Sequence, residues 1–107
     1  MAEGVRNLRI EVADTTSPTT VALTGEIDVV SSRRLRSALL AIANSGEHCV
    51  VVDLTNVTFM DSTGLSALVA ARKRMLSLEG QIILRSPSPG VRKVLEITGL
   101  MRVFTVE

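Results

Sequence analysis

The feature that most constrains this chain is a short apolar strand followed directly by a helix, in residues 50–80. Residues 50–54, VVVDL, predict a buried strand because the run is short and β-branched and the turn-prone Thr55 and Asn56 follow it. Apolar positions then recur at helical spacing, and Gly80 predicts where that helix ends. These apolar positions are Leu65, Leu68, Val69 and Leu76, and Arg72 lies at the same spacing between them. A strand that leads into a helix in this way is typical of layered α/β proteins.

The connection between this strand and this helix, residues 59–64 (FMDSTG), carries the candidate functional residues. Asp61 or Ser62 is expected to cap the helix, because either side chain can accept a hydrogen bond from the free N–H groups of the first turn. The hydroxyls of Ser62 and Thr63 are therefore expected beside a carboxylate at the positive end of a helix dipole. Gly64 is expected to let another molecule approach closely, since a side chain there is expected to protrude next to Ser62.

The N-terminal third predicts two strands and a helix. Residues 8–12 and 21–27 alternate apolar and polar positions, and a polar turn at residues 14–19 lies between them. Because the two runs are close in sequence, they predict an antiparallel hairpin. A helix follows, with Asp28 or Ser31 as its expected cap.

The C-terminal third continues the alternation of strands and helices. Residues 81–85, QIILR, predict another short strand. Ser88 followed by Pro89 is typical of a helix start, and Gly99 predicts the end of that helix. Residues 103–106 are expected to form a final strand or an extended tail.

Length and alternation together predict one α/β domain covering residues 1–107. The sheet is expected to be mixed and to have four to five strands, because helical crossovers require parallel neighbours in its centre while the first hairpin is antiparallel. Three to four helices are expected to pack against it.

Composition excludes several classes of function. Aromatic residues are only 2% of the chain and the formal net charge is +1, so neither base stacking nor a basic surface supports nucleic-acid binding. The single cysteine, Cys49, is expected to be buried and inert in a strand, which argues against a disulfide framework and a thiolate metal site. No apolar run is long enough for a signal peptide core or a membrane span. We therefore expect a cytoplasmic protein that binds another protein and uses no metal or cofactor.

The hydrolase interpretation of Ser62 is not supported by its surroundings. A GxSxG elbow requires glycine at position 60, where Met60 stands, and the only histidine, His48, is expected at a strand edge. The DSTG run also differs by one inserted residue from an aspartic-protease motif, and no second copy supplies the partner carboxylate. The chain is therefore not expected to be an enzyme.

Three stretches resemble a known family. Residues 57–65 (VTFMDSTGL), with GEID at residues 25–28 and VRKVLEITGL at residues 91–100, closely resemble the bacterial anti-sigma-factor antagonists, which are single STAS domains. The resemblance covers nearly the whole chain in the same order. It implies that Ser62, which follows the aspartate, is phosphorylated by an anti-sigma factor that is also a serine kinase of the histidine-kinase ATPase fold. It implies further that the unphosphorylated protein binds this partner and frees the sigma factor, and that a metal-dependent PP2C-type phosphatase restores binding.

The resemblance also implies which residues contact the partner, and it implies a monomer or weak dimer. The implied partner-binding residues are Glu26, Asp28, Asp61, Ser62, Thr63, Gly64 and Leu65. Thr63 is in addition a minor candidate phosphosite, because some relatives carry a second serine there. The alternative function is a STAS scaffold in a stress-signalling assembly or a nucleotide-binding regulatory domain, although no GxxxxGK[ST] loop supports nucleotide binding.

Several of these residues also have purely structural explanations. Asp28 can be a plain helix cap and Glu26 a solvated carboxylate. Phe59 and Met60 are expected in the core under the loop, with an exposed apolar contact as the alternative. The basic residues expected on solvated helix faces are Arg33, Arg34, Arg36, Arg72, Lys73 and Arg74.

Overall fold

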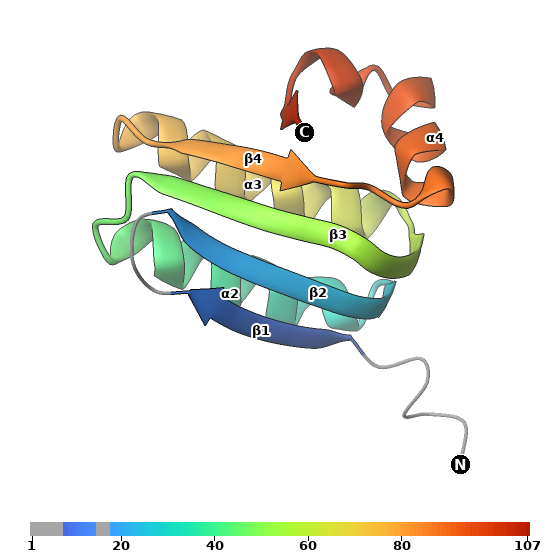
Figure 1. Ribbon diagram of the computed structural model, residues 1–107, viewed down its shortest axis with the longest axis horizontal. Coiled ribbons are helices and arrows are strands. Elements are labelled where there is room, and N and C mark those ends of the chain that lie inside the picture. The colour runs from blue at the N-terminus through green and yellow to red at the C-terminus, as the bar shows by residue number, and fades with distance from the viewer. Residues whose placement is uncertain (1–7, 15–17) are drawn as a thin grey trace.

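A five-stranded mixed sheet with two helices side by side on one face forms the frame of the molecule (Figure 1). The computed structural model describes residues 8–14 and 18–107. The strands lie in sequence order, the first pair antiparallel and the others parallel, so the predicted α/β fold is confirmed. The elements are β1 (Arg9–Asp14), β2 (Thr19–Ile27), α2 (Ser31–Asn44), β3 (Cys49–Met60), α3 (Ser62–Ser77), β4 (Gln81–Arg85), α4 (Pro89–Ile97), η1 (Leu100–Arg102) and β5 (Thr105–Val106). Residues 1–7 and residues 15–17 of the predicted turn at residues 14–19 lie outside the described residues.

The core between the sheet and the helices is aliphatic, as the composition predicts. Alternate residues of the strands point to α2 and α3, and one stripe of each helix points back. Its largest fully buried side chains include Leu23, Ile27, Leu35, Leu54, Leu68, Met75, Leu84 and Leu95. Each such side chain contributes about 1.5–3 kcal/mol by leaving water, so this shared layer fixes how α2 and α3 lie on the sheet.

Strand β3 is longer than the sequence predicts. The prediction that it ends at residue 54, before a turn at Thr55 and Asn56, is wrong. The N–H and the hydroxyl of Thr55 both donate to the Asp53 carboxylate, at 3.0 and 2.6 Å. Ala22 of β2 pairs with Asp53 while Thr24 pairs with Asn56, so β3 holds one extra residue at this point. The turn-prone residues therefore form a β-bulge inside the strand, and β3 continues to its C-terminal end beside the start of α3.

Helix α3 differs from the predicted pattern near its C-terminal end. Met75 is buried, whereas Leu76 is half exposed. The left-handed residue after the helix is Glu79, with φ of 62°, and not Gly80. Gly80 is nevertheless required, because a Cβ atom there would lie 2.9 Å from the backbone oxygen of His48.

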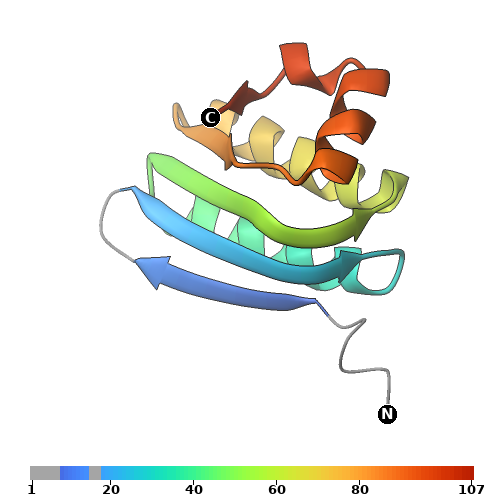
Figure 2. The same cartoon turned by 45° about the vertical axis from the view of Figure 1, so that its right-hand side comes forward.

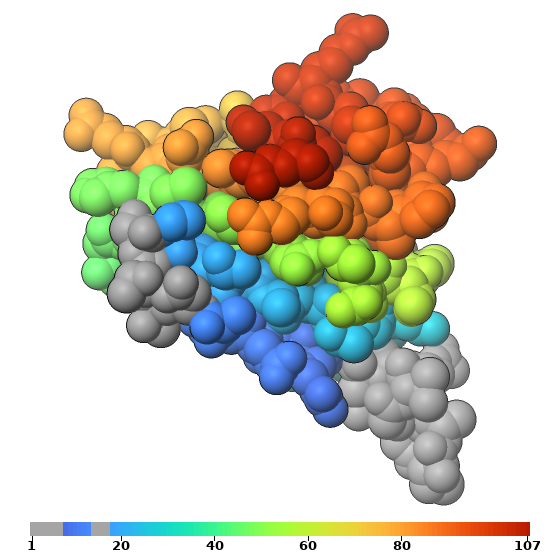
Figure 3. All heavy atoms as spheres, in the orientation of Figure 1, coloured from blue at the N-terminus to red at the C-terminus, as the bar shows by residue number. Residues whose placement is uncertain are grey.

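The C-terminal segments gather beyond β4, at the edge of the sheet away from β1 (Figure 2). On the face opposite α2 and α3, side chains of β2 and β3 reach the surface, and α4, η1 and β5 lie above them in the view (Figure 3). Ser88 precedes α4 as predicted, but its hydroxyl donates to the Val57 oxygen at 2.6 Å and does not cap the helix. This hydrogen bond ties the start of α4 to the C-terminal half of β3.

Two further expectations of burial are corrected by the structure. Met60 is in the core at 3% exposure, but Phe59 is 48% exposed because successive strand residues point to opposite faces. Cys49 begins β3 and is partly exposed, not buried. Within the described residues, no helix is both long and apolar enough to cross a bilayer.

Candidate partner-binding site at the start of α3

Asp61 is the residue that caps α3. Its backbone is extended, and its carboxylate accepts hydrogen bonds from the N–H groups of Thr63 at 2.9 Å and Gly64 at 3.3 Å. The hydroxyl of Thr63 donates to the same carboxylate oxygen. Of the two expected caps, Asp61 therefore holds the first turn, and the side chain of Ser62 takes no part in it.

Ser62 and Thr63 are neighbours with different surroundings. Ser62 is the first residue of α3 and is exposed. Its hydroxyl makes no hydrogen bond to another described residue. Thr63 is partly buried, and its hydroxyl proton is engaged by Asp61. The helix start therefore presents one available hydroxyl, that of Ser62.

The C-terminal end of β2 is fixed beside this helix start. Ile27 pairs with Met60, and the N–H of Asp61 donates to the Ile27 oxygen at 3.2 Å. Asp28, the next residue, accepts hydrogen bonds from the N–H groups of Val30 and Ser31 at 3.0 and 2.9 Å. Asp28 is thus the side-chain cap of α2 and lies at the same end of the sheet as Asp61.

Glu26 is a strand residue and not part of a loop. It lies in β2, partly buried, and pairs with Phe59 of β3. Its backbone oxygen accepts from the Ser31 hydroxyl at 3.0 Å, while the N–H of Asp28 donates to that hydroxyl at 2.9 Å. This network orders the connection between β2 and α2, in which the Asp28 carboxylate and the Glu26 backbone have structural roles.

Gly64 faces the core and not a partner. A Cβ atom at this position would lie 2.7 Å from the Ile27 Cγ2 atom and 2.7 Å from the Met60 Cγ atom. The expectation that a side chain here would protrude next to Ser62 is therefore wrong, because α3 packs on the sheet at this point. Leu65 is 6% exposed, so its side chain is also mainly a core residue.

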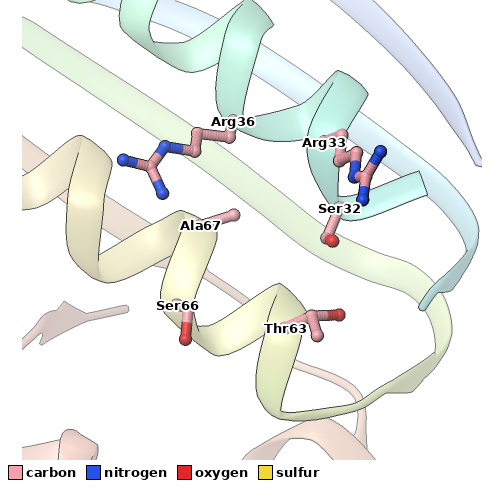
Figure 4. Close-up of a pocket in the computed structure, with 6 residues that line it drawn as sticks. All are labelled: Ser32, Arg33, Arg36, Thr63, Ser66 and Ala67. Carbon is pink, nitrogen blue, oxygen red and sulfur yellow. The ribbon is translucent and has the colours of Figure 1, made fainter. Parts of the chain in front are cut away.

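Two hollows flank the first turns of α3. An open groove of about 430 Å³ lies between α3 and the C-terminal segments, with Ser62, Leu65 and Leu100 among its lining residues. A smaller pocket of about 200 Å³ lies between α2 and α3 and includes Thr63 and Arg36 (Figure 4). Ser62 and Thr63 therefore border different hollows, on opposite sides of the helix start.

Several apolar side chains at this end of the sheet are exposed. The sequence alone does not reveal their exposure. Val29 and Val30, between Asp28 and α2, are 58% and 74% exposed. Phe59 precedes Met60 and is also exposed. Exposure of such residues depends on which strand face is covered, and periodicity alone does not show it. Exposed apolar side chains close to charged ones are typical of protein-binding surfaces.

A catalytic serine–histidine pair is not formed. His48 precedes β3 and Ser62 follows it, so the 12 residues of the strand separate them. At about 3.3 Å per strand residue this separation is on the order of 35 Å. Within the described residues, no group of three potential metal-ligating side chains comes together either.

A lowered pKa is found at Asp53, outside this site. The hydroxyl of Thr55 lowers the pKa of the Asp53 carboxyl, the N–H of Thr55 and the charge of Arg85 lower it further, and partial burial opposes them. This shift belongs to the bulge in β3 and has a structural cause.

Comparison with known proteins agrees with this fold. The STAS domain family model matches residues 8–107. The anti-sigma-B factor antagonist of Staphylococcus epidermidis is 33% identical over 100 residues, covering 94% of this chain and 93% of that protein. The anti-sigma-B factor antagonist of Listeria monocytogenes is 29% identical over 102 residues, covering 94% and 90%. The crystal structure of an anti-sigma factor antagonist from Mycobacterium paratuberculosis has a TM-score of 0.84 at 28% identity and covers 94% of this chain and 85% of that one.

The fold defines a small α/β domain with a mixed five-stranded sheet. The chain belongs to the STAS domain family, and the resemblance carried by residues 57–65 is confirmed.

Proposed function

We propose that this protein is an anti-sigma factor antagonist that binds an anti-sigma factor through the start of α3 and is switched off by phosphorylation of Ser62. The observation that carries the proposal is the exposed Ser62 hydroxyl in the first turn of α3, beside a carboxylate that is already engaged as the helix cap. The names of the relatives in Staphylococcus and Listeria support the same function. The proposed activity is regulatory binding and not catalysis.

The geometry favours Ser62 over Thr63 as the phosphoacceptor. A phosphoryl group on Ser62 Oγ needs no internal hydrogen bond to break, whereas Thr63 would have to give up its bond to Asp61. In the proposed step the Ser62 oxygen attacks the γ-phosphorus of ATP on the partner kinase. The bond to the bridging oxygen of ADP breaks, and the serine proton passes to a base of the kinase. Hydrolysis by a PP2C-type phosphatase would return serine and inorganic phosphate.

Phosphorylation would change binding more than folding. The group adds about −1.5 to −2 charges. In the free protein the phosphate remains in water beside the N–H groups and the positive dipole end of α3, where anions are stabilised. In a complex it would be desolvated next to Asp61, and an unpaired buried charge costs on the order of 2–5 kcal/mol. That cost corresponds to roughly a 30- to several-thousand-fold loss of affinity.

The proposed contact surface combines the residues that the structure brings to this end of the sheet. Asp28, Ser62 and Thr63 lie at its polar centre, and the Leu65 edge lies in the groove beside Ser62. Glu26 and Asp61 are assigned to the surface as residues that hold its shape and charge. The protein would act in the cytoplasm as a monomer or weak dimer.

The test is a mixing experiment with each candidate anti-sigma factor of the source organism, with and without ATP. We expect one of them to form a complex with the protein when ATP is absent and to transfer a single phosphate to Ser62 when ATP is present, located by mass spectrometry. If none of them binds the protein in either condition, the proposal is wrong.

A further inference from the structure

The pocket between α2 and α3 carries an unbalanced positive charge. Arg33 and Arg36 of α2 line it together with Ser32, and Thr63 and Ala67 of α3 lie opposite. In Figure 4 the side chains of Ser32 and Thr63 face one another across the gap between the helices, and the two arginines border it on either side. No acidic side chain is among the residues that line it.

The two arginines are not neutralised within the described residues. Both are exposed, and neither forms an ion pair or hydrogen bond with another described residue. By contrast, Arg34 between them donates to the Leu8 oxygen at 3.0 Å. Arg33 and Arg36 are therefore the members of this basic run that remain available to another molecule.

The position of these charges is unfavourable for the helix itself. Three arginines lie within the first six residues of α2, where the helix dipole is positive and disfavours cations. Arg33 and Arg36 are three residues apart along the helix, and their guanidinium groups extend to opposite sides of the pocket (Figure 4). Helix α2 itself contains no acidic residue, and the carboxylate at its start is that of Asp28, which precedes it. An anion that binds from outside the helix would therefore meet a favourable charge at this pocket.

The size of the pocket limits what that anion can be. Its volume is about 200 Å³, below the roughly 300–1,000 Å³ that is typical of sites for small-molecule ligands. A single carboxylate side chain fits in a pocket of this size. Guanidinium groups pair well with carboxylates. The Ser32 hydroxyl makes only a 3.3 Å bond to the Val29 oxygen and can turn to donate to the incoming group.

We propose that this pocket receives one acidic side chain of the anti-sigma factor, attracted by Arg33 and Arg36, which border the pocket on either side. The inference rests on the proposed function, because it extends the same binding surface across α3. Thr63 lines the pocket and Ser62 precedes it, so the acidic side chain lies beside the phosphorylation site. Binding of the partner would thus combine an ion pair on the α2 side of α3 with contacts in the groove on the other side.

The first experiment tests the pocket without any partner. The protein is titrated with sodium acetate and, separately, with inorganic phosphate at constant ionic strength, and amide and arginine side-chain NMR signals are followed. We expect saturable shifts centred on Ser32, Thr63 and the Nε–H groups of Arg33 and Arg36. In the R33Q/R36Q variant the shifts should disappear. Shifts that spread over the whole surface, or that persist in this variant, would overturn the site.

The second experiment uses the anti-sigma factor found in the mixing test. R33E/R36E should lower the affinity of the unphosphorylated protein at least tenfold, and R33Q/R36Q should lower it less and reduce its salt dependence. The control is R9E, since Arg9 is exposed on β1 and points to the face opposite the buried Leu8. The R9E affinity should stay within twofold, and melting temperatures should show that all variants fold.

The outcomes separate the two proposals. If the wild-type protein binds an anti-sigma factor and R33E/R36E binds it equally well, the acidic contact is wrong and the proposed function stands. If acetate or phosphate binds the pocket but partner affinity is unchanged, the pocket is an anion site that the partner does not use, and the inference is again wrong. If no anti-sigma factor binds the wild-type protein, the proposed function itself fails.

Discussion

Ser62 and Thr63 show how neighbouring hydroxyls acquire different chemistry from their positions in one helix turn. The Thr63 hydroxyl completes the cap formed by Asp61 and faces the α2 side, whereas the Ser62 hydroxyl is left to solvent and faces the groove. The sequence contains both residues, but it does not show which of the two hydroxyls donates to the capping carboxylate of Asp61.

Replacing Ser62 with alanine should abolish phosphate incorporation by the cognate kinase. The Thr63→Ala variant is the matched control and should still be phosphorylated, because its change leaves the Ser62 hydroxyl in place. Mass spectrometry after incubation with kinase and ATP gives both results. Undiminished incorporation in Ser62→Ala would show that the acceptor is another residue.

Gly64 should be required for stability. In Gly64→Ala the added methyl group meets the side chains of Ile27 and Met60 at 2.7 Å, so the core must shift, which costs about 1–3 kcal/mol. Gly90→Ala is the control, because it makes the same change inside helix α4 with nothing within 4 Å of the new atom.

Chemical denaturation of the two variants measures this difference. The free energy of unfolding should fall in Gly64→Ala and stay the same or rise in Gly90→Ala, since alanine is the better helix former in both places. Equal stability of the two variants would contradict the inward orientation of Gly64.

At the scale of elements, the position of the site depends on the continuation of β3 beyond its bulge. β3 holds one extra residue near Asp53 and a second between Val57 and Phe59, and it stays paired with β2 up to Met60. Asp61 therefore lies against the end of β2. A strand that ended at residue 55 would leave the helix start without this support.

The Thr55→Val substitution should raise the pKa of the Asp53 carboxyl toward its ordinary value of 3.8, because the hydroxyl of Thr55 is the main cause of its lowering. A lowered folded-state pKa adds stability above the unfolded-state pKa, and this stability is lost as the pH falls through the folded-state value. The variant should therefore lose less stability below pH 3.8 than the wild-type protein.

An NMR titration of the Asp53 side-chain carboxyl checks this shift. Thr58→Val is the control, since the hydroxyl of Thr58 donates to the Gly25 oxygen and does not contact Asp53. An unchanged pKa in Thr55→Val would mean that the bulge is held in another way.

Much of the fold was predictable because the spacing of apolar residues along the chain follows the buried face of each strand and helix. The antiparallel hairpin follows from alternating apolar residues, helix α3 from apolar residues at helical spacing, and strand β4 from a short apolar run. The errors arise where tertiary pairing overrides local preference. Turn-prone Thr55 and Asn56 became a bulge because β2 offers partners on both sides of them. Ser88 was expected to cap a helix, but its hydroxyl reaches the oxygen of Val57, which is distant in sequence.

The candidate site was predictable only in part. The DSTG run locates the helix start, and Asp61 and Ser62 occupy the expected place. The inward direction of Gly64 and the exposure of Phe59 depend on how α3 and β3 pack, and the sequence has no local signal for either. Arg36 and Thr63 line the same pocket because α2 and α3 pack side by side, and the sequence has no local signal for this contact.

At the scale of the whole molecule, phosphorylation should leave the sheet and helices in place. Ser62 is exposed at a helix N-terminus that stabilises an anion, so the fold has little reason to rearrange. Amide NMR shifts between the two forms of the free protein should be confined to Asp61–Leu65 and the end of β2. Widespread shifts in β1 and β4 would show a conformational switch instead of a local one.

The most direct test of a binding switch at Ser62 is the affinity of one anti-sigma factor for the two forms of this protein. Isothermal titration calorimetry with the unphosphorylated protein and with protein phosphorylated only at Ser62 should give dissociation constants that differ at least tenfold, about 1.4 kcal/mol, in favour of the unphosphorylated form. Equal affinities for the two forms would contradict the account.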